Sequence, residues 1–267
     1  MYPTLIKLGS FEITTFGLMM FAAFIVGGWV LTRQFRRYGL SDDAASSIVM
    51  AAALGGIAGA KIYYAILFRD WHLLLDRAGL VWYGGLIGGV LCCAGYLLLK
   101  RMDFFTVADA ASPALAIGYA LGRIGCFLVG DDYGRPTDSW VGIAFPKGSP
   151  PTTAESLRQF GVHLDPSIPP DQLLRVHPTQ LYESASAFVM FAILMYASKR
   201  PHARGRIFGL FLVLMGIERF LVEIVRAKDD RFIGAFTVAQ LISVLIFVCG
   251  TALVLRSRSA DYADVRR

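Results

Sequence analysis

Two arginines, Arg123 and Arg219, lie inside stretches of the sequence that are otherwise apolar. Arg219 is followed by Glu223 and Arg226 at spacings of four and seven residues, which predicts three side chains on one face of a helix, with the carboxylate between two guanidiniums. A charged group at the centre of a bilayer costs at least about 2.5–3.5 kcal/mol, so these arginines need a carboxylate partner or a polar cavity. The residues leave open a buried ion pair that joins helices and an anion site. Phosphate would suit an anion site, because the planar guanidinium donates two parallel hydrogen bonds and does not titrate.

More polar residues flank a long loop between two of the apolar stretches. Pro178 and Thr179 are placed where a helix would begin, which predicts that residues 177, 180 and 183 lie near one face. Adjacent acids such as Asp131 and Asp132 are weak evidence for a metal without a supporting histidine, and no metal or cofactor is predicted. The polar candidates at the two ends of the loop are Cys126, Asp131, Gly134, His177, Gln180, Tyr182 and Glu183.

The composition indicates the environment in which these residues are held. Of 267 residues, 55% are hydrophobic and 17% are charged, whereas soluble domains carry about 25% charged residues. These values exclude a disordered chain, a soluble domain and a secreted disulfide-bonded module, and they predict an integral membrane protein. The net charge of +6 would suggest nucleic-acid binding in a soluble protein. Here it bears on topology, and nucleic acid is not a predicted partner.

Seven apolar stretches are long enough to cross a hydrocarbon core of about 30 Å as helices. The predicted fold is therefore an all-α integral membrane protein with seven transmembrane helices. The stretches are Ile13–Leu31, Ala44–Phe68, Leu80–Leu99, Val107–Val129, Thr179–Ala197, Ile207–Ile224 and Phe236–Leu255.

Basic residues are concentrated in short segments on one predicted side of the membrane. The positive-inside rule then puts the N-terminus outside and the C-terminus in the cytoplasm. These residues follow the first, third, fifth and seventh stretches: Arg33, Arg36, Arg37, Lys100, Arg101, Lys199, Arg200, Arg204, Arg206, Arg256, Arg258, Arg266 and Arg267.

The chain is predicted to form a single membrane domain over residues 1–267. Residues 130–178, between the fourth and fifth stretches, hold eight of the eleven prolines and are predicted to form an extracytoplasmic head insert. A loop this long in a compact protein is usually functional or disordered.

Glycines recur at spacings of four residues inside the apolar stretches, for example Gly55 with Gly59 and Gly84 with Gly88. Small residues at this spacing let helix backbones approach closely in lipid, so helix packing explains most of them. The group Tyr83-Gly84-Gly85 also fits a second interpretation, in which it leaves space for a bulky ligand.

Several of these segments, in this order, resemble the prolipoprotein diacylglyceryl transferase family. The resemblance covers about residues 10–255, and its segments with Arg123 and with His177 are more specific than its glycine segments. The matching stretches are Phe16-Gly17-Leu18, Tyr83-Gly84-Gly85-Leu86-Ile87-Gly88, Gly122-Arg123-Ile124-Gly125-x-Phe127, Gly130-Asp131-x-Tyr133-Gly134-Arg135, His177-Pro178-Thr179-Gln180-Leu181-Tyr182-Glu183 and Arg219-Phe220-x-Val222-Glu223-x-x-Arg226.

The resemblance implies a reaction and a location. A diacylglyceryl group would move from phosphatidylglycerol to the lipobox cysteine thiol of a preprolipoprotein, with formation of a thioether and release of glycerol-1-phosphate. The partners would be this anionic lipid and the preprolipoprotein signal peptide, in the bacterial cytoplasmic (inner) membrane. No cofactor is implied.

The resemblance also assigns roles to residues. Arg123 and Arg219 would bind the phosphate, Glu223 would orient Arg219, and Arg226 would hold the end of the site. Asp131 and Gly134 would lie near the headgroup, beside Gly84, Gly85 and Cys126. The outer wall would be shaped by His177, Gln180, Tyr182 and Glu183.

Four features depart from the family pattern, and one of them is the acidic segment, which reads Asp131-Asp132. The histidine that usually precedes Gly-Gly-Leu is Tyr83, the asparagine after Arg-x-Gly is Cys126, and a tyrosine one turn before Arg219 is Met215. A tyrosine with a pKa near 10 is a poorer base than histidine at neutral pH, although its hydroxyl still donates to a phosphate. These departures predict a diverged member with Tyr83 in the catalytic place. They leave open an alternative, a lipid-binding or lipid-moving relative without transfer chemistry.

Overall fold

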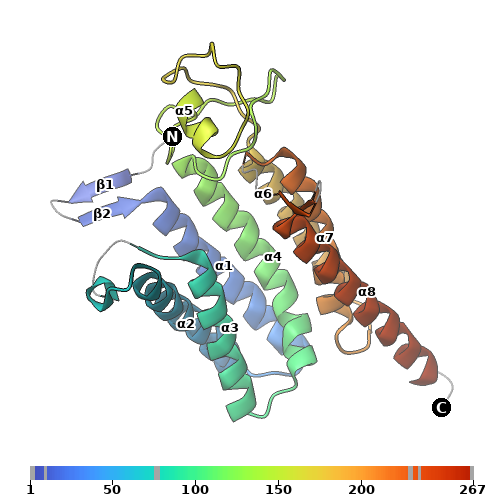
Figure 1. Ribbon diagram of the computed structural model, residues 1–267. Coiled ribbons are helices and arrows are strands. Elements are labelled where there is room, and N and C mark those ends of the chain that lie inside the picture. Colours follow the sequence, from blue (N-terminus) through green and yellow to red (C-terminus); the bar gives the residue numbers. More distant parts are fainter. Residues whose placement is uncertain (1–3, 9–10, 75–78, 228–230, 234–235, 265–267) are drawn as a thin grey trace. The chain divides into compact units, whose positions relative to one another are not determined.

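The computed structural model of the chain describes residues 4–8, 11–74, 79–227, 231–233 and 236–264, and within them the fold is helical (Figure 1). Two short antiparallel pairs join strands β1 (Thr4–Leu8) and β2 (Phe11–Thr14), and strands β3 (Arg231–Ile233) and β4 (Phe236–Thr237). The helices are α1 (Thr15–Arg37), α2 (Asp42–Phe68), the 3-10 helix η1 (Trp71–Leu74), α3 (Trp82–Leu99), α4 (Phe104–Val129), α5 (Ala154–Gln159), α6 (Thr179–Ala197), α7 (Arg206–Val225) and α8 (Val238–Asp264).

Within the described residues, six helices are long and apolar enough to cross a membrane: α1, α2, α3, α4, α6 and residues 238–257 of α8. The predicted class, an integral membrane protein built from helices, is confirmed. Helix α7 has 20 residues but carries Glu218, Arg219 and Glu223 in its second half. Its role as a seventh span, and the orientation of the chain, stay predictions.

The chain divides into two compact units. The first holds Met1–Gly27 and Ser112–Arg267, and the second holds Gly28–Ala111, so the division falls within α1 and α4. Tyr83, Gly84 and Gly85 belong to the second unit, and the other candidate residues belong to the first.

Glycines bring α2 and α3 into backbone contact in the second unit. A Cβ atom added at Gly59 would collide with the carbonyl oxygen of Gly84, and one added at Gly88 would collide with that of Gly55. Close approach of backbones supplies van der Waals contact in lipid, where no hydrophobic force joins helices. Gly84 is therefore a packing residue, and Gly85 likewise faces α2, near the carbonyl oxygen of Gly56. The neighbouring Tyr83 is 65% exposed.

The first unit contains α6, α7 and α8. Gly209 and Gly216 of α7 lie against α8, where an added Cβ would come within 3.0 Å of the carbonyl oxygen of Gly250 and 2.8 Å of that of Ser243. Met190 and Leu194 of α6 are buried with Ile207 of α7. This packing sets the relation between the two helices that carry Glu183 and Arg219.

Residues 130–178 have an apolar core of their own, which explains why so proline-rich a segment is ordered. The rings of Tyr133 and Phe145 stack with centroids 5.7 Å apart, and Leu157 of α5 and Val176 are buried against them. The Tyr133 hydroxyl donates to the carbonyl of Pro151 at 3.2 Å. Burial raises the pKa of Tyr133 to about 12. Thr153 caps α5 by accepting a hydrogen bond from the N–H of Ser156.

Candidate functional site

The carboxylate of Glu183, in the second turn of α6, is the point at which the two intramembrane arginines meet. Its Oε2 lies 3.1 Å from Nε of Arg123 on α4, and its Oε1 lies 3.9 Å from Nη1 of Arg219 on α7. The Tyr119 hydroxyl donates to Oε1 at 3.2 Å. Because Glu183 is 1% exposed, its charge needs these partners. Three helices therefore supply one cluster of charges.

Arg219 and Glu223 form the expected pair on α7, but Arg226 does not continue their row. Arg219 Nη2 lies 2.7 Å from Glu223 Oε2. Helix α7 ends at Val225, and Arg226 has an extended backbone with φ −68° and ψ 146°. The predicted placement of Glu223 between two guanidiniums is therefore wrong, because the helix stops one residue before Arg226.

Asp132 takes that bridging place instead. Its Oδ2 lies 3.0 Å from Arg123 Nη1 and its Oδ1 lies 2.8 Å from Arg226 Nη2. Its side chain is 46% exposed, against 15% for Arg123 and 17% for Arg226, and its backbone has a positive φ of 55°, which is uncommon outside glycine. Burial alone would raise the pKa of Asp132, but the charges of Arg226 and Arg123 outweigh it and hold the pKa below its ordinary value.

Asp131 has different surroundings from its neighbour. Its carbonyl accepts a hydrogen bond from Nε2 of Gln180, whereas its buried carboxylate Oδ1 has no hydrogen-bond partner within the described ranges. Burial, and next the charge of Asp132, raise the pKa of Asp131 above its ordinary value. The pKa values of these two adjacent carboxylates are thus shifted in opposite directions.

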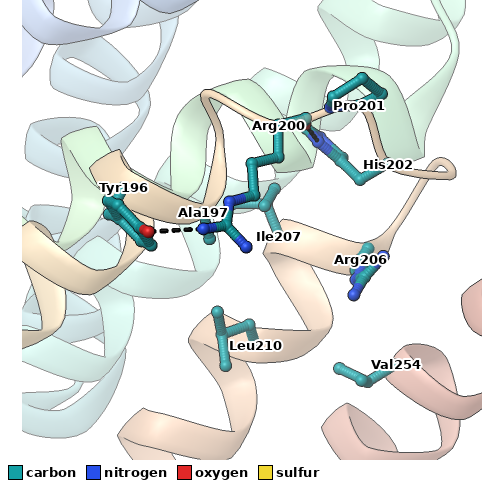
Figure 2. A pocket seen from close by; sticks show the side chains of 9 residues that line it. All are labelled: Tyr196, Ala197, Arg200, Pro201, His202, Arg206, Ile207, Leu210 and Val254. Carbon is teal, nitrogen blue, oxygen red and sulfur yellow. Dashed lines mark hydrogen bonds between the residues drawn. The ribbon is translucent and has the colours of Figure 1, made fainter.

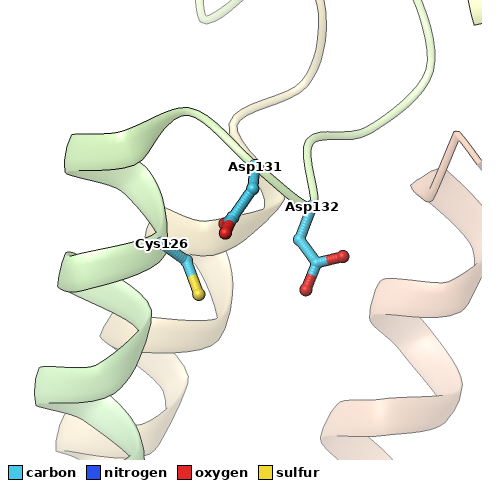
Figure 3. Close-up of side chains that lie close together, drawn as sticks. All are labelled: Cys126, Asp131 and Asp132. Atoms are coloured by element: carbon cyan, nitrogen blue, oxygen red, sulfur yellow. The ribbon is translucent and has the colours of Figure 1, made fainter. Parts of the chain in front are cut away.

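Cys126, Asp131 and Asp132 lie close together (Figure 3), with one sulfur or oxygen atom of each within 4.8 Å of the others. Both carboxylate oxygens of Asp132 are already in ion pairs with arginines. The Cys126 sulfur lies 3.9 Å from Arg123 Nη1. Charge pairing therefore accounts for the position of Asp132.

Backbone contacts at Gly134 hold the open end of the cluster. The N–H of Gly134 donates to the His177 carbonyl at 2.8 Å, and the N–H of Arg135 donates to the Val225 carbonyl at 2.8 Å. A Cβ atom at Gly134 would lie only 2.5 Å from that Val225 oxygen. These contacts join the head insert, the start of α6 and the end of α7, and we refer to them as the Gly134 junction.

Side chains at the start of α6 complete the junction. The Thr179 hydroxyl donates to the Asp132 carbonyl at 2.7 Å. His177 Nδ1 and the Tyr182 hydroxyl lie 3.2 Å apart, and both residues are partly buried. Gln180 is buried and holds the Asp131 backbone, as described above. The residues from 177 to 183 therefore fix the backbone that presents Asp132 to the arginines.

Several buried polar atoms of the cluster have no hydrogen-bond partner among the residues that the structure describes. Most buried polar groups in proteins are hydrogen-bonded, and exceptions often mark functional sites. The atoms concerned are Asp131 Oδ1, Gln180 Oε1, Glu218 Oε2, Arg219 Nη1 and Glu223 Oε2, of which the last two take part in ion pairs.

The structure thus brings together most of the residues predicted from the sequence and adds three. Tyr119 lies one turn before Arg123, and its hydroxyl also approaches Glu218 Oε1 at 3.4 Å. Tyr119 could have been found from its spacing of four residues to Arg123. Asp132 and Glu218 could have been found because they are adjacent to Asp131 and to Arg219, respectively. The predicted residues gathered in the first unit are Cys126, Arg123, Asp131, Gly134, His177, Gln180, Tyr182, Glu183, Arg219, Glu223 and Arg226.

Fold and site together define a multi-helix membrane protein with two partly buried arginines among its helices, which is suited to an anionic ligand. The model of the prolipoprotein diacylglyceryl transferase family matches residues 3–256. The chain belongs to this family, and it is a transferase of lipoprotein biosynthesis.

Curated relatives match nearly the whole chain. A phosphatidylglycerol–prolipoprotein diacylglyceryl transferase of Chromohalobacter salexigens is 31% identical over 99% of this chain and 95% of its own length. Relatives with the same name from Geobacter sulfurreducens and Clostridium tetani are 32% and 28% identical, over 96% and 94% of this chain and 95% of their own lengths. Nothing in these values marks the chain as divergent.

Proposed function

We propose that this protein transfers the diacylglyceryl group of phosphatidylglycerol to the lipobox cysteine of preprolipoproteins. The proposal rests on one observation. The guanidiniums of Arg123 and Arg219 both lie within 4 Å of the Glu183 carboxylate, and Arg226 forms an ion pair with Asp132. Guanidiniums in a site with little water stabilise negative charge that develops on a phosphate. The names of the relatives supply the substrates.

Phosphate binding would exchange one anion for another. Each of the three guanidiniums is already within 4 Å of a carboxylate. Asp132 is the most exposed of these carboxylates and bridges Arg123 and Arg226 with its two oxygens, as a phosphate would. We propose that the phosphate of the lipid displaces Asp132, while Glu183 and Glu223 continue to orient Arg123 and Arg219.

The transfer step balances without a cofactor. The thiol sulfur forms a bond to the terminal glyceryl carbon, and the bond between this carbon and the phosphate oxygen breaks. The electron pair leaves on that oxygen, which ends protonated in glycerol-1-phosphate, so the thiol proton is the one that must be moved. The thiolate is the attacking form. Tyr83 stays a sequence-based candidate for this proton transfer.

The remaining candidates have positioning roles in this proposal. His177, Gln180 and Tyr182 would shape the outer wall, and Gly134 would hold the junction there. Gly84 and Gly85 would affect the site only through the packing of α3 on α2. The protein would be a multi-pass protein of the bacterial cytoplasmic membrane, with α7 as a seventh span and with residues 130–178 as an extracytoplasmic head on a single membrane domain.

The test is a direct assay of the purified full-length protein with phosphatidylglycerol and a synthetic lipobox peptide, read by mass spectrometry of the peptide. The expected result is a diacylglyceryl thioether on cysteine, with one glycerol-1-phosphate released per peptide. A curated relative assayed in parallel controls for the conditions. Lipid that stays bound but is not consumed, while the relative is active, would replace the proposal by the lipid-binding alternative.

Tyr83 is tested in the same assay. If its hydroxyl takes part in the proton transfer, Tyr83→Phe lowers kcat with little change in KM, and Tyr83→His preserves or raises kcat. Equal activity of wild type and Tyr83→Phe would remove Tyr83 from the catalytic residues and leave the arginine assignment unaffected.

A further inference from the structure

A cavity of about 310 Å³ lies at the far end of the α6–α7 pair from the candidate site (Figure 2). Along α6, the 13 residues from Glu183 to Tyr196 rise by about 20 Å, so the cavity does not overlap the arginine cluster. The end of α6, the α6–α7 loop, the start of α7 and one residue of α8 line it. The lining residues used below are Tyr196, Arg200, His202, Arg206, Leu210 and Val254.

The polar wall of the cavity carries basic groups held in place by local contacts. Arg200 donates a hydrogen bond to the Tyr196 hydroxyl, and its guanidinium lies 4.9 Å from the centroid of the Tyr196 ring. His202 Nδ1 lies 2.6 Å from the Arg200 carbonyl oxygen, which fixes the direction of the imidazole. Holding these side chains in advance lowers the entropy that a ligand must remove on binding.

The start of α7 adds to the positive potential of this wall. Helix α7 begins at Arg206 after Gly205, which has a φ of 84° and no side chain to cap the helix. The N–H groups and dipole of a helix N-terminus favour an anion. Arg206 itself lines the cavity.

The opposite wall is apolar. Leu210, one turn into α7, and Val254 of α8 line it beside Ile207. A cavity with basic groups at one end and branched aliphatic side chains at the other matches an amphipathic ligand. A small soluble anion would use only the basic end.

We propose that this cavity binds the phosphate of an anionic glycerophospholipid, with the first part of an acyl chain against Leu210 and Val254. Arginine recognises phosphate through paired hydrogen bonds, and basic pockets between membrane helices are suited to lipid headgroups. The site is separate from the arginine cluster and does not depend on the proposed reaction. By the sequence-based orientation it would face the cytoplasmic leaflet.

The test must separate this site from the candidate substrate site and from general attraction of basic loops to anionic membranes. Hydrogen exchange provides a local measurement, because residues 196–210 and residues 119–134 are different peptides. The full-length protein is placed in nanodiscs of phosphatidylcholine with increasing fractions of phosphatidylglycerol. Exchange protection of residues 196–210 is expected to rise and saturate.

The variant Arg200→Gln/Arg206→Gln removes two lining cations, and Arg204→Gln is the matched control. Arg204 is an exposed residue of the same loop and is not part of the cavity wall. The lipid fraction at half protection is expected to rise about tenfold in the double variant and to stay within about twofold in the control. The single variants Arg200→Gln and Arg206→Gln serve if the double variant does not fold.

Three results would overturn the proposal. Equal shifts for Arg204→Gln and the double variant would reduce the effect to general charge attraction. Unchanged protection in the double variant would show that Arg200 and Arg206 take no part in binding. The same protection from inorganic phosphate in phosphatidylcholine discs would identify the free ion, rather than a lipid, as the ligand. Transferase activity is expected to be unchanged in the double variant.

Discussion

The two ends of the α6–α7 pair hold arginines in contrasting ways. At one end, the side chains of Arg123 and Arg219 are only 15% and 26% exposed, and each lies within 4 Å of a carboxylate. At the other end, Arg200 is exposed, and within the described part of the chain its side chain donates to the phenol of Tyr196. The first arrangement compensates charge inside the protein, and the second presents charge to its surroundings.

This difference follows from the energetics of burial. An ion taken out of water without a partner loses several kcal/mol of solvation, so a buried guanidinium requires a carboxylate. A guanidinium in contact with water does not, and salt screens it more strongly. We therefore expect a ligand of the buried cluster to compete with Asp132, and a ligand of the cavity at α7 to bind with strong salt dependence.

The most damaging change to the buried end is removal of either intramembrane arginine. Arg123→Ala and Arg219→Ala are each expected to lower kcat/KM about 100- to 1,000-fold, the range for loss of one donor to developing charge. Arg204→Gln, which removes one basic charge elsewhere, should keep full activity. Activity within tenfold of wild type in both alanine variants would show that the cluster is a structural ion-pair network only.

The next largest effect is expected at the Gly134 junction. In Gly134→Ala the new Cβ would lie 2.5 Å from the Val225 carbonyl oxygen and 2.8 Å from His177 Cβ. We expect a loss of about 1–3 kcal/mol, read as a lower thermal midpoint in detergent. Gly95→Ala is the matched control, since a Cβ at Gly95 meets nothing within 4 Å and alanine is favoured in a helix by about 0.5–1 kcal/mol. Equal midpoints for both variants would contradict the role of Gly134 in positioning Arg226.

A smaller effect is expected at Asp131 and Asp132, whose contributions to stability change with pH in opposite directions. The pKa of Asp132 is lowered, so its stabilisation is present above the ordinary aspartate pKa and is lost as pH falls through the folded value. The pKa of Asp131 is raised, so its ionisation removes stability as pH rises from the ordinary value through the folded one. At pH 7, Asp132→Asn should therefore lose up to about 1 kcal/mol, whereas Asp131→Asn should gain stability.

Thermal midpoints between pH 3 and pH 7 check both signs. Asp132→Asn should show a flatter decline than wild type at the acidic end, and Asp131→Asn should show a smaller loss as pH rises from the acidic end. Shifts of the same sign in the two variants would contradict the difference in their surroundings.

The smallest effect is expected at Cys126. Its sulfur is a weak hydrogen-bond acceptor and lies 3.9 Å from Arg123 Nη1, so Cys126→Ala should change kcat/KM by less than about twofold. The assay is the same as for the arginine variants. A large loss would assign the thiol a part in the site beyond packing.

Much of the fold could be predicted because apolar length and helix signals act locally. The predicted stretch Thr179–Ala197 coincides with α6, where Pro178 precedes the first turn and an apolar run follows it. It was also predictable that Arg123 and Arg219 would pair with an acid such as Glu183, since a charge inside the membrane requires a partner. Which charges pair was not predictable, because that depends on which helices are neighbours.

The errors and omissions have the same origin. Arg226 was predicted on the face of α7 that carries Glu223, but the backbone leaves the helix at that residue to pair with Gly134. The spacing of Tyr119 from Arg123 was a local signal, but its contacts with Glu183 and Glu218 depend on which helices are neighbours. Such roles arise between segments about 60 to 100 residues apart, beyond the reach of local pattern.

The backbone contact between α2 and α3 has a consequence for biogenesis. These helices are adjacent in the chain, and their glycine faces need no later segment in order to associate once both have left the ribosome and entered the bilayer. The arginine cluster, by contrast, is complete only after residue 226 has been synthesised. Contacts that are local in sequence form early. We therefore expect a hairpin of α2 and α3 to assemble first, before the charges of α4 meet their partners on α6 and α7.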